Sequence, residues 1–447
     1  MTAVPGSTGP ILPPARRSRT ASSEKRKDRE PRKDRESRRT APVYINRELS
    51  WLEYSARVLF EAADPRNPLL ERVRFLTIFA AMLDEFFQIR MSGLRQQVAA
   101  GSLAVSPDGR TAGEQLAAAR ERVLGLVAEL SAIYLELRKT LAAAGIEIVK
   151  YSAIPEHHED LRRRFLEEIF PVLTPLAVDP AHPFPYLGNR SLCLVAAIRA
   201  GARSALPDTR LSVIHIPGLP LPRFIALPDP DGRHVFILLE DAIHLHLPTI
   251  YTGYDILSSH AIRITRDADL QPPGRPEDLL TSIEESLRER RLGTAVRLQY
   301  DGDLPSDILA TLRDELEMRP EDLYEDKGFA VFSDLLQLYA ALDIPRLKDR
   351  PLPPHPVSAF ATAPDIWSAL RAQDILVHHP YHSFDAVTRF VREASVDPKV
   401  LAIKMTLYRV SPASPIAHAL HTAVENGKEV AVLVELQARF DEEANIR

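Results

Sequence analysis

The stretch that decides the fold is residues 400–436, VLAIKMTLYRVSPASPIAHALHTAVENGKEVAVLVEL. Two apolar runs rich in β-branched residues flank a helical pattern at 414–428, which ends at Gly427. Upstream, DILVHHP (374–380) has the composition of a strand, and FDAVTRFVREASVD (384–397) that of a helix. This β-α-β-α-β pattern predicts three parallel strands joined by right-handed crossovers.

Parallel strands bring their carboxyl ends to one edge of a sheet, where ligands of such folds bind. The residues that follow the three runs are 380–383, Tyr408 with Arg409, and 437–439, which include Arg439. The planar guanidinium fork matches phosphate oxygens, so two arginines on one edge predict an anion site. The alternative left open is that Arg439 pairs with a neighbouring acid, Asp441 or Glu442.

The first ordered part is predicted to be helical. Ser50 and Glu53 have capping-box spacing, and Pro68 precedes an apolar-periodic run over 69–98. Thr111 and Glu114 have the same capping-box spacing at the start of a third helix, which ends at Gly145. Within the second run lies an acidic pair, Asp84 and Glu85. Two interpretations of this pair remain open: a catalytic role, or surface charges at the end of a buried face.

The middle of the chain mixes short strands and helices without regular alternation, and PDPDG at 228–232 predicts a hairpin. A proline-rich linker follows. The fold class predicted for the whole is α+β and multidomain. The expected domains are a tail at 1–42, a helical domain at 43–148, an α+β head domain at 149–345, the linker at 346–358 and an α/β domain at 359–447.

Composition separates the N-terminal tail from the rest. Residues 1–41 carry 12 Lys and Arg against 5 Asp and Glu, a net charge of +7, whereas the whole chain carries −5. Such a segment is predicted to be disordered, either as a tether for an anionic polymer or nucleic acid or as a solvated tail. The single cysteine, Cys193, fits a reducing cytosol. We expect a cytoplasmic protein, because no membrane span or secretory signal is recognisable.

Histidine clusters raise the possibility of a metal site. His378, His379 and His382 lie close in sequence, and His244 and His246 form a second group. On a strand, however, His378 and His379 would point to opposite faces, and no acidic or cysteine ligand has matching spacing. A place on a half-buried strand or helix edge is the other interpretation of HLHL at 244–247.

Five longer segments together resemble the signatures of the polyphosphate kinase family of the long bacterial type. They are YINRELSWLEYSARVLFEAAD (44–64), RFLTIFAAMLDEFFQIR (74–90), DILVHHPYHSFD (374–385), LAIKMTLYRV (401–410) and NGKEVAVLVELQARFDEEANI (426–446). The resemblance implies a helical domain, a head domain and the start of a phospholipase-D-like α/β domain. It also implies a cytoplasmic transferase that moves the terminal phosphate of ATP reversibly onto inorganic polyphosphate through a phosphohistidine.

The resemblance assigns three positions. Arg409 and Arg439 match the family's phosphate and magnesium site; because arginine has no lone pair for a metal, they should bind phosphate oxygens that Mg²⁺ also binds. Met82 stands where the family has an asparagine that contacts the nucleotide, and a thioether cannot replace that amide. The implied partners are ATP or ADP, inorganic polyphosphate and further copies of the chain in a homo-oligomer; nucleic acid is not expected.

The family's phosphorylated histidine lies in an H-x-K motif downstream of A-R-F-D-E. None of the 14 histidines here is followed two positions later by lysine. We therefore expect this chain to be the N-terminal two-thirds of a polyphosphate kinase, inactive by itself. The alternative is a non-catalytic polyphosphate- or nucleotide-binding module that has lost the histidine. A phospholipase-D-like hydrolase has no histidine motif to support it.

Overall fold

The computed structural model describes residues 44–178, 184–200, 209–218, 220–269, 293–326, 331–411, 413–436, 438 and 441–446. They belong to one compact unit, residues 44–447. The predicted tail and a helical pattern at 277–291 lie outside the described residues, and so does Arg439. Among the helices that are described, none combines the length and the apolar character needed to cross a bilayer.

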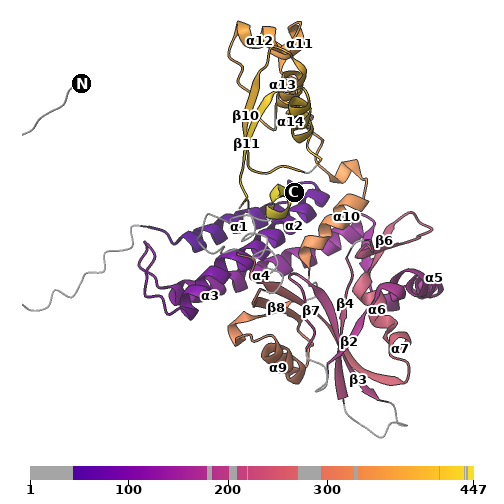
Figure 1. Ribbon diagram of the computed structural model, residues 1–447. Helices are drawn as coiled ribbons and strands as arrows, with labels where there is room; N and C mark the ends of the chain where they lie inside the picture. The colour runs from indigo at the N-terminus through magenta and orange to yellow at the C-terminus, as the bar shows by residue number, and fades with distance from the viewer. Residues whose placement is uncertain are drawn as a thin grey trace, which may run out of the picture. The chain divides into compact units, whose positions relative to one another are not determined.

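The N-terminal region is helical, as predicted (Figure 1). Helix α1 (Arg47–Ala63) packs against α2 (Leu69–Glu85), which continues through a π-helical turn, η1 (Phe86–Met91), into α3 (Ser92–Ala99). The long helix α4 (Ala112–Ala143) packs against all of these. The capping box between Thr111 and Glu114 is confirmed, and Gly145 follows the helix at a φ of +81°.

The predicted start of α1 is wrong. Its N-cap is Asn46, whose side-chain oxygen accepts hydrogen bonds from the backbone N–H groups of Glu48 (3.0 Å) and Leu49 (3.1 Å). Ser50 lies inside the first turn instead. Asn46 is buried and donates to Gln115 on α4, so a tertiary contact decides between two residue types that cap equally well.

The middle region contains two sheets. The larger has the strand order β2-β4-β3-β7-β8-β9, and the smaller has the order β1-β6-β5. The predicted hairpin at 228–232 joins the antiparallel strands β5 and β6. The strands are β1 (Ile146–Val149), β2 (Pro175–Val178), β3 (Leu192–Ala200), β4 (Thr209–His215), β5 (Phe224–Leu227), β6 (His234–Leu238), β7 (Tyr254–Arg266), β8 (Ala295–Asp301) and β9 (Leu323–Asp326).

Strand β3 is buried on both faces, and alternate side chains belong to two separate cores. Leu194 and Ile198 contribute to one core, and Cys193 and Val195 to the other. Among the described residues, the α-helices of this region are α5 (His158–Arg164), α6 (Leu239–Leu245), α7 (Leu247–Ile250), α9 (Ser306–Glu315) and α10 (Leu335–Ala341).

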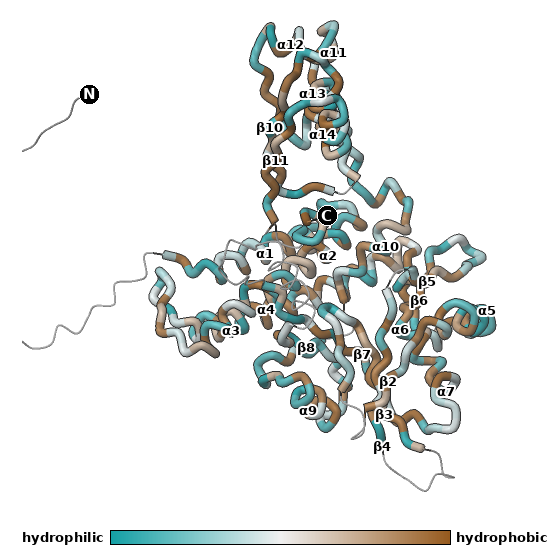
Figure 2. The backbone as a smooth tube through the Cα atoms, viewed as in Figure 1, coloured by the Kyte–Doolittle hydropathy of each residue, from teal (hydrophilic) through white to brown (hydrophobic). Residues whose placement is uncertain are grey.

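The C-terminal region contains the two strands read from residues 400–436. Strands β10 (Ala402–Leu407) and β11 (Glu429–Val434) are parallel, and Leu407 is the partner of Val434. Figure 2 shows apolar residues concentrated along both strands. One small core joins them to two helices, α13 (Asp385–Val396) and α14 (Pro415–Glu425). The remaining helices are α11 (Ser358–Thr362), α12 (Ile366–Ala372) and α15 (Glu442–Ile446).

The third predicted strand, at 374–380, is not formed. Residues 373–378 have no regular secondary structure, and Leu376 is 90% exposed. Just after it, the backbone N–H of His355 donates to the carbonyl of Tyr381, and the carbonyl of His355 accepts from the N–H of Ser383, so residues 381–383 pair with an isolated stretch and not with β10. An apolar run forms a strand only where an adjacent strand pairs with its backbone N–H and C=O groups. The sequence of the run does not specify whether such a strand is present.

A buried charge cluster joins the helical region to the large sheet. Asp84 on α2 accepts hydrogen bonds from Arg263 on β7, at 2.8 and 2.5 Å, and from Arg297 on β8. Gln299 links Arg263 to Asp326 at the end of β9. Asp84 is 4% exposed, so the interpretation of this residue as a surface charge is wrong; Glu85 beside it is exposed.

The pKa values of the two carboxylates in this cluster, Asp84 and Asp326, are shifted in opposite directions. Burial by itself would raise the pKa of Asp84, but the two guanidiniums outweigh it and lower the pKa to about 2. Burial raises the pKa of Asp326 to about 7, because Arg297, Gln299 and Arg263 only partly offset the desolvation of its carboxylate.

We predict that Asp84→Asn strongly destabilises the chain. It leaves Arg263 and Arg297 buried without their counter-charge, and breaking a buried pair in this way costs about 3–5 kcal/mol. Urea denaturation should show the midpoint falling for Asp84→Asn and unchanged for Glu85→Gln, the exposed neighbour. Equal midpoints for both variants would contradict a stabilising role of the cluster.

Because of the raised pKa of Asp326, we predict that the free energy of unfolding falls as the pH rises from about 4 to about 7. In that window the folded chain holds a proton that the unfolded chain, with an aspartate pKa of about 3.9, has released. Asp326→Asn keeps an acceptor for Gln299 and removes the titration. Between pH 5 and pH 8, the unfolding free energy of the wild type should therefore fall by a few kcal/mol more than that of this variant. The size of the difference follows from the shift in the pKa of Asp326, at about 1.4 kcal/mol per pH unit within the window.

The matched control is Glu325→Gln, at the exposed position next to Asp326. It should retain the pH dependence of the wild type. If Asp326→Asn retains it as well, Asp326 is ionised in the folded chain and the predicted titration is wrong.

Candidate functional site

The carboxyl ends of β10 and β11 lie side by side and form the candidate site. Tyr408 and Arg409 follow β10, as the sequence predicted, and Glu435 follows β11, its N–H donating to the carbonyl of Leu407 at 3.0 Å. The prediction that Arg439 joins this edge stays a prediction.

Arg409 is held by a carboxylate and remains accessible. Its Nε lies 2.9 Å from Oδ2 of Asp441, and its Cζ lies 5.6 Å from the ring centroid of Tyr408. The side chains of Arg409 and Asp441 are 54% and 43% exposed, so an anion from solvent can reach the guanidinium. The sequence left Asp441 open as a partner for Arg439; in the structure it pairs with Arg409.

Helix α15 closes over the edge through one side chain that sequence reasoning missed. Nδ2 of Asn445 donates to the carbonyl of Tyr408 at 2.7 Å and to that of Glu435 at 2.8 Å. One amide therefore ties together the residues that follow the two strands. Nothing in the local pattern marks Asn445, because its two acceptors are separated from it by 37 and 10 residues.

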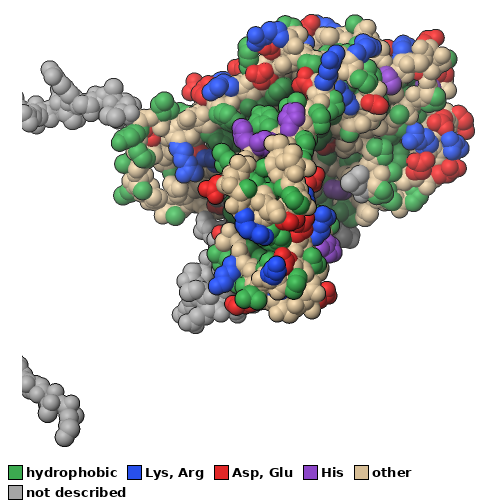
Figure 3. Space-filling model, turned by 90° about the horizontal axis from the view of Figure 1, so that it is seen from above, with side chains coloured by type: hydrophobic (Ala, Val, Ile, Leu, Met, Phe, Trp, Pro, Cys, Tyr) green, Lys and Arg blue, Asp and Glu red, His purple; other side chains and the backbone are tan. Residues whose placement is uncertain are grey.

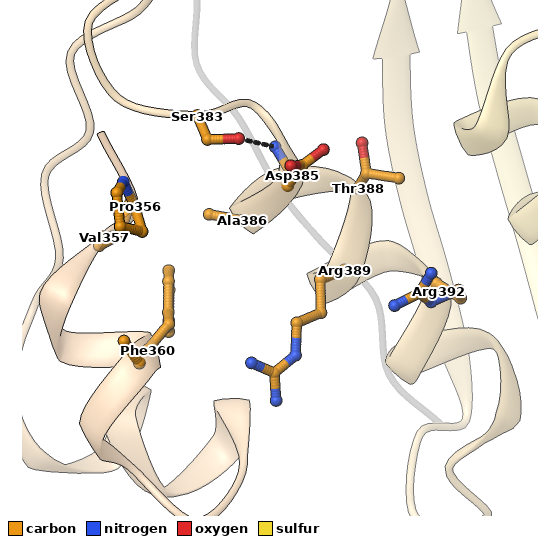
Figure 4. A pocket seen from close by; sticks show the side chains of 10 residues that line it. Pro356, Val357, Phe360, Ser383, Asp385, Ala386, Thr388, Arg389 and Arg392 are labelled. Carbon is orange, nitrogen blue, oxygen red and sulfur yellow. Dashed lines mark hydrogen bonds between the residues drawn. The ribbon is translucent and has the colours of Figure 1, made fainter. Parts of the chain in front are cut away.

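A hollow of about 450 Å³ lies between α11 and α13 (Figure 4). Its apolar side includes Val357 and Phe360, and Arg389 and Arg392 extend from α13 beside it. Nε of Arg389 lies 2.5 Å from Oε1 of Glu393, one turn further along the same helix. Ser383, one of the residues predicted to lie at the edge, precedes α13 here, and its hydroxyl accepts from the N–H of Asp385 at 3.1 Å.

The first histidine group, His378, His379 and His382, forms hydrogen bonds within its own loop. Nδ1 of His382 accepts from the N–H of His378 at 3.0 Å, and Nδ1 of His379 lies 2.9 Å from the carbonyl of His382. The second group lies at a helix edge, where His246 is buried and its Nδ1 lies 2.7 Å from the carbonyl of Ala242. In the described part of the chain, no three His, Cys, Asp or Glu side chains are grouped to hold a metal ion.

Met82 is half-buried on α2, two residues before Asp84. Its predicted place at the nucleotide stays a prediction. Asp84 forms ion pairs with two arginines, which gives this member of the acidic pair a structural role. Figure 3 shows acidic and basic side chains interspersed over the face seen from above, so a bound anion would depend on individual side chains there and not on a broad field.

Comparisons with known proteins match nearly all of the compact unit. Residues 44–149 match the polyphosphate kinase N-terminal domain, residues 156–338 match the polyphosphate kinase middle domain, and residues 365–447 match the polyphosphate kinase C-terminal domain 1.

Individual relatives agree. The chain is 44% identical over 437 residues to a polyphosphate kinase from Thermosynechococcus vestitus, covering 90% of this chain and 59% of the relative. It is 42% identical over 464 residues to one from Mycobacterium ulcerans, covering 99% and 59%. A crystal structure of polyphosphate kinase from Porphyromonas gingivalis matches with a TM-score of 0.73 at 30% identity, covering 90% and 57%. The chain thus spans less than two thirds of the length of these proteins.

Replacing Asn445 should release α15 locally without unfolding the rest. Asn445→Leu removes the donor shared by two carbonyls, so the backbone amides of 441–446 should exchange with deuterium faster, while those of α13 and α14 are unchanged. Hydrogen exchange with mass spectrometry measures both. His421→Leu, at an exposed position on α14, serves as control. Unchanged exchange at 441–446 would show that Asn445 does not hold the helix.

Proposed function

On the premise that the chain belongs to the polyphosphate kinase family, we propose that its protein transfers the terminal phosphate of ATP reversibly to inorganic polyphosphate. The observation that carries this proposal within the chain is Arg409, accessible at the carboxyl edge of two parallel strands. Since the chain covers 57–59% of its relatives' length, the activity is proposed for the whole protein.

The role proposed for Arg409 is to bind phosphate oxygens. Phosphoryl transfer depends mainly on positioning and on stabilising charge, and an arginine supplies both through fixed N–H donors. The ion pair with Asp441 orients the guanidinium before substrate arrives. On this proposal Arg439 contributes a second guanidinium to the same phosphates. Met82 faces the nucleotide, and its thioether lacks the side-chain amide of the asparagine that the family resemblance implies at this position.

The residues present fit a Mg²⁺ ion held mainly by phosphate oxygens. Arg409 cannot bind a cation, and the carboxylate paired with it, Asp441, is the candidate protein ligand. When bound, Mg²⁺ would neutralise charge on the phosphates. A magnesium bound in this way needs few protein ligands, which agrees with the side chains at this edge.

The proposed route for the phosphate is through a phosphohistidine in an H-x-K motif, a motif that these 447 residues do not contain. On this proposal the histidine lies beyond residue 447, and the working enzyme is a cytoplasmic homo-oligomer. The 447-residue chain alone, given labelled ATP and magnesium, should then acquire no acid-labile label.

The test of the function uses the complete protein with ATP, ADP, polyphosphate and magnesium. Polyphosphate should lengthen at high ATP, and ATP should form from ADP and polyphosphate in reverse. Binding of these ligands without turnover in either direction would overturn the kinase proposal in favour of a binding module.

We predict that Arg409→Lys, in that protein, lowers kcat/KM about ten-fold to a hundred-fold. Lysine keeps the charge and loses the bidentate fork, and a charge-assisted hydrogen bond contributes about 1.5–3 kcal/mol. Arg371→Lys, at an exposed position on α12, should change neither activity nor stability. Melting temperature is measured on the same samples. A loss of stability with turnover per folded molecule intact would mean that Arg409 serves only its ion pair with Asp441.

A further inference from the structure

A second cavity, of about 560 Å³, lies between the helical region and the turn that precedes β9. It is bordered by the end of η1 and by α3, by the first turns of α4, and by η7 (Pro320–Asp322) with the residue before it. Neither Met82 nor Arg409 lines it. Its volume falls in the range typical of sites for small organic ligands.

One side of this cavity is apolar. Met91 contributes from η1 and Val98 from α3, and Leu116 and Leu124 contribute from α4. Leu124 is 40% exposed, so burial of this surface by a ligand would be favourable at roughly 25 cal/mol per Å². The apolar side therefore suits a flat or branched hydrocarbon body.

Most of the charge around the cavity is internally balanced. Nη1 of Arg95 lies 2.9 Å from Oδ1 of Asp322, and both side chains are largely buried. The other oxygen of Asp322 accepts from the backbone N–H of Arg319 at 2.9 Å. This carboxylate is thus already occupied and does not oppose an incoming anion strongly.

Arg120 is different, because it is oriented but not neutralised. Its Nε donates to the backbone carbonyl of Glu321 at 2.7 Å, and its Cζ lies 5.6 Å from the ring centroid of Tyr324. Within the described residues its terminal amino groups have no hydrogen-bond partner. The carboxylates of Glu121 and Glu321 are exposed, so water and salt screen them.

We propose that this cavity binds an amphipathic anion: a sulfonate, phosphate or carboxylate group on a flat apolar body. The body packs on the leucines of α4, and the anionic group accepts from the terminal amino groups of Arg120. Because Arg120 is held in place before binding, little side-chain freedom is lost when the anion arrives.

Two dyes with the same aromatic body test this in the 447-residue chain. Anilinonaphthalene sulfonate carries the anion, and phenylnaphthylamine lacks it. Fluorescence titration should show the sulfonate binding at least ten-fold more tightly than the neutral dye. Equal affinities, or no binding of the sulfonate, would overturn the anion proposal.

Two variants place the site. Arg120→Met should weaken sulfonate binding about ten-fold or more and leave the neutral dye unchanged. Gly113→Trp should abolish binding of the sulfonate, because Gly113 lines the cavity, an added Cβ there meets no atom within 4 Å, and the indole would occupy space that the dye needs. A residue other than glycine also favours the helix, so this variant should fold.

The control is Arg57→Met, at an exposed position on α1, which should bind the sulfonate like the wild type. If Gly113→Trp binds the dye as tightly as the wild type, the dye sits elsewhere and the proposed site is wrong. If Arg120→Met does so, the anion is not held by Arg120 and the proposal fails on that ground.

Discussion

The contact on which the rest depends is the buried pairing of Asp84 with Arg263 and Arg297. At this point α2 meets the large sheet. The three residues are far apart in sequence, and their charges are buried away from solvent that would screen them. Desolvating three ions is costly, and the cost is recovered only while all three stay in place. The pairing therefore fixes where α2 and the π-helical turn after it lie on strands β7 and β8.

That constraint also positions the last turn of α2 and the π-helical turn after it. Met82 lies two residues before Asp84, and the wall of the second cavity begins at Met91, in the π-helical turn. Phe87 in the same turn lies under Arg297, with the guanidinium carbon 4.3 Å from the ring centroid. A π turn shifts the side chains that follow it around the helix axis, so Met91 and Arg95 face α4 and η7 in a way that an uninterrupted helix would not provide.

The candidate edge on β10 and β11 has a different construction. Its strands are short and half exposed, and its arginine is paired near the surface and not in the core. A surface pair contributes little to stability, whereas an exposed guanidinium can exchange one anion for another. The cluster around Asp84 thus provides rigidity, and the pair of Arg409 with Asp441 leaves an anion site accessible.

Local periodicity, turn residues and the geometry of parallel strands were enough to predict the three helices, the hairpin at 228–232, the parallel pair β10–β11 and the position of Arg409 after β10. Tertiary structure decided the rest. Asn46, and not Ser50, is the N-cap because its side chain contacts Gln115 on α4, and within the described part of the chain residues 374–380 belong to no sheet. Asp84 is buried because it contacts Arg263 and Arg297. These partners lie 179 and 213 residues away in the sequence, and a contact at that separation leaves no mark in the local pattern of either segment.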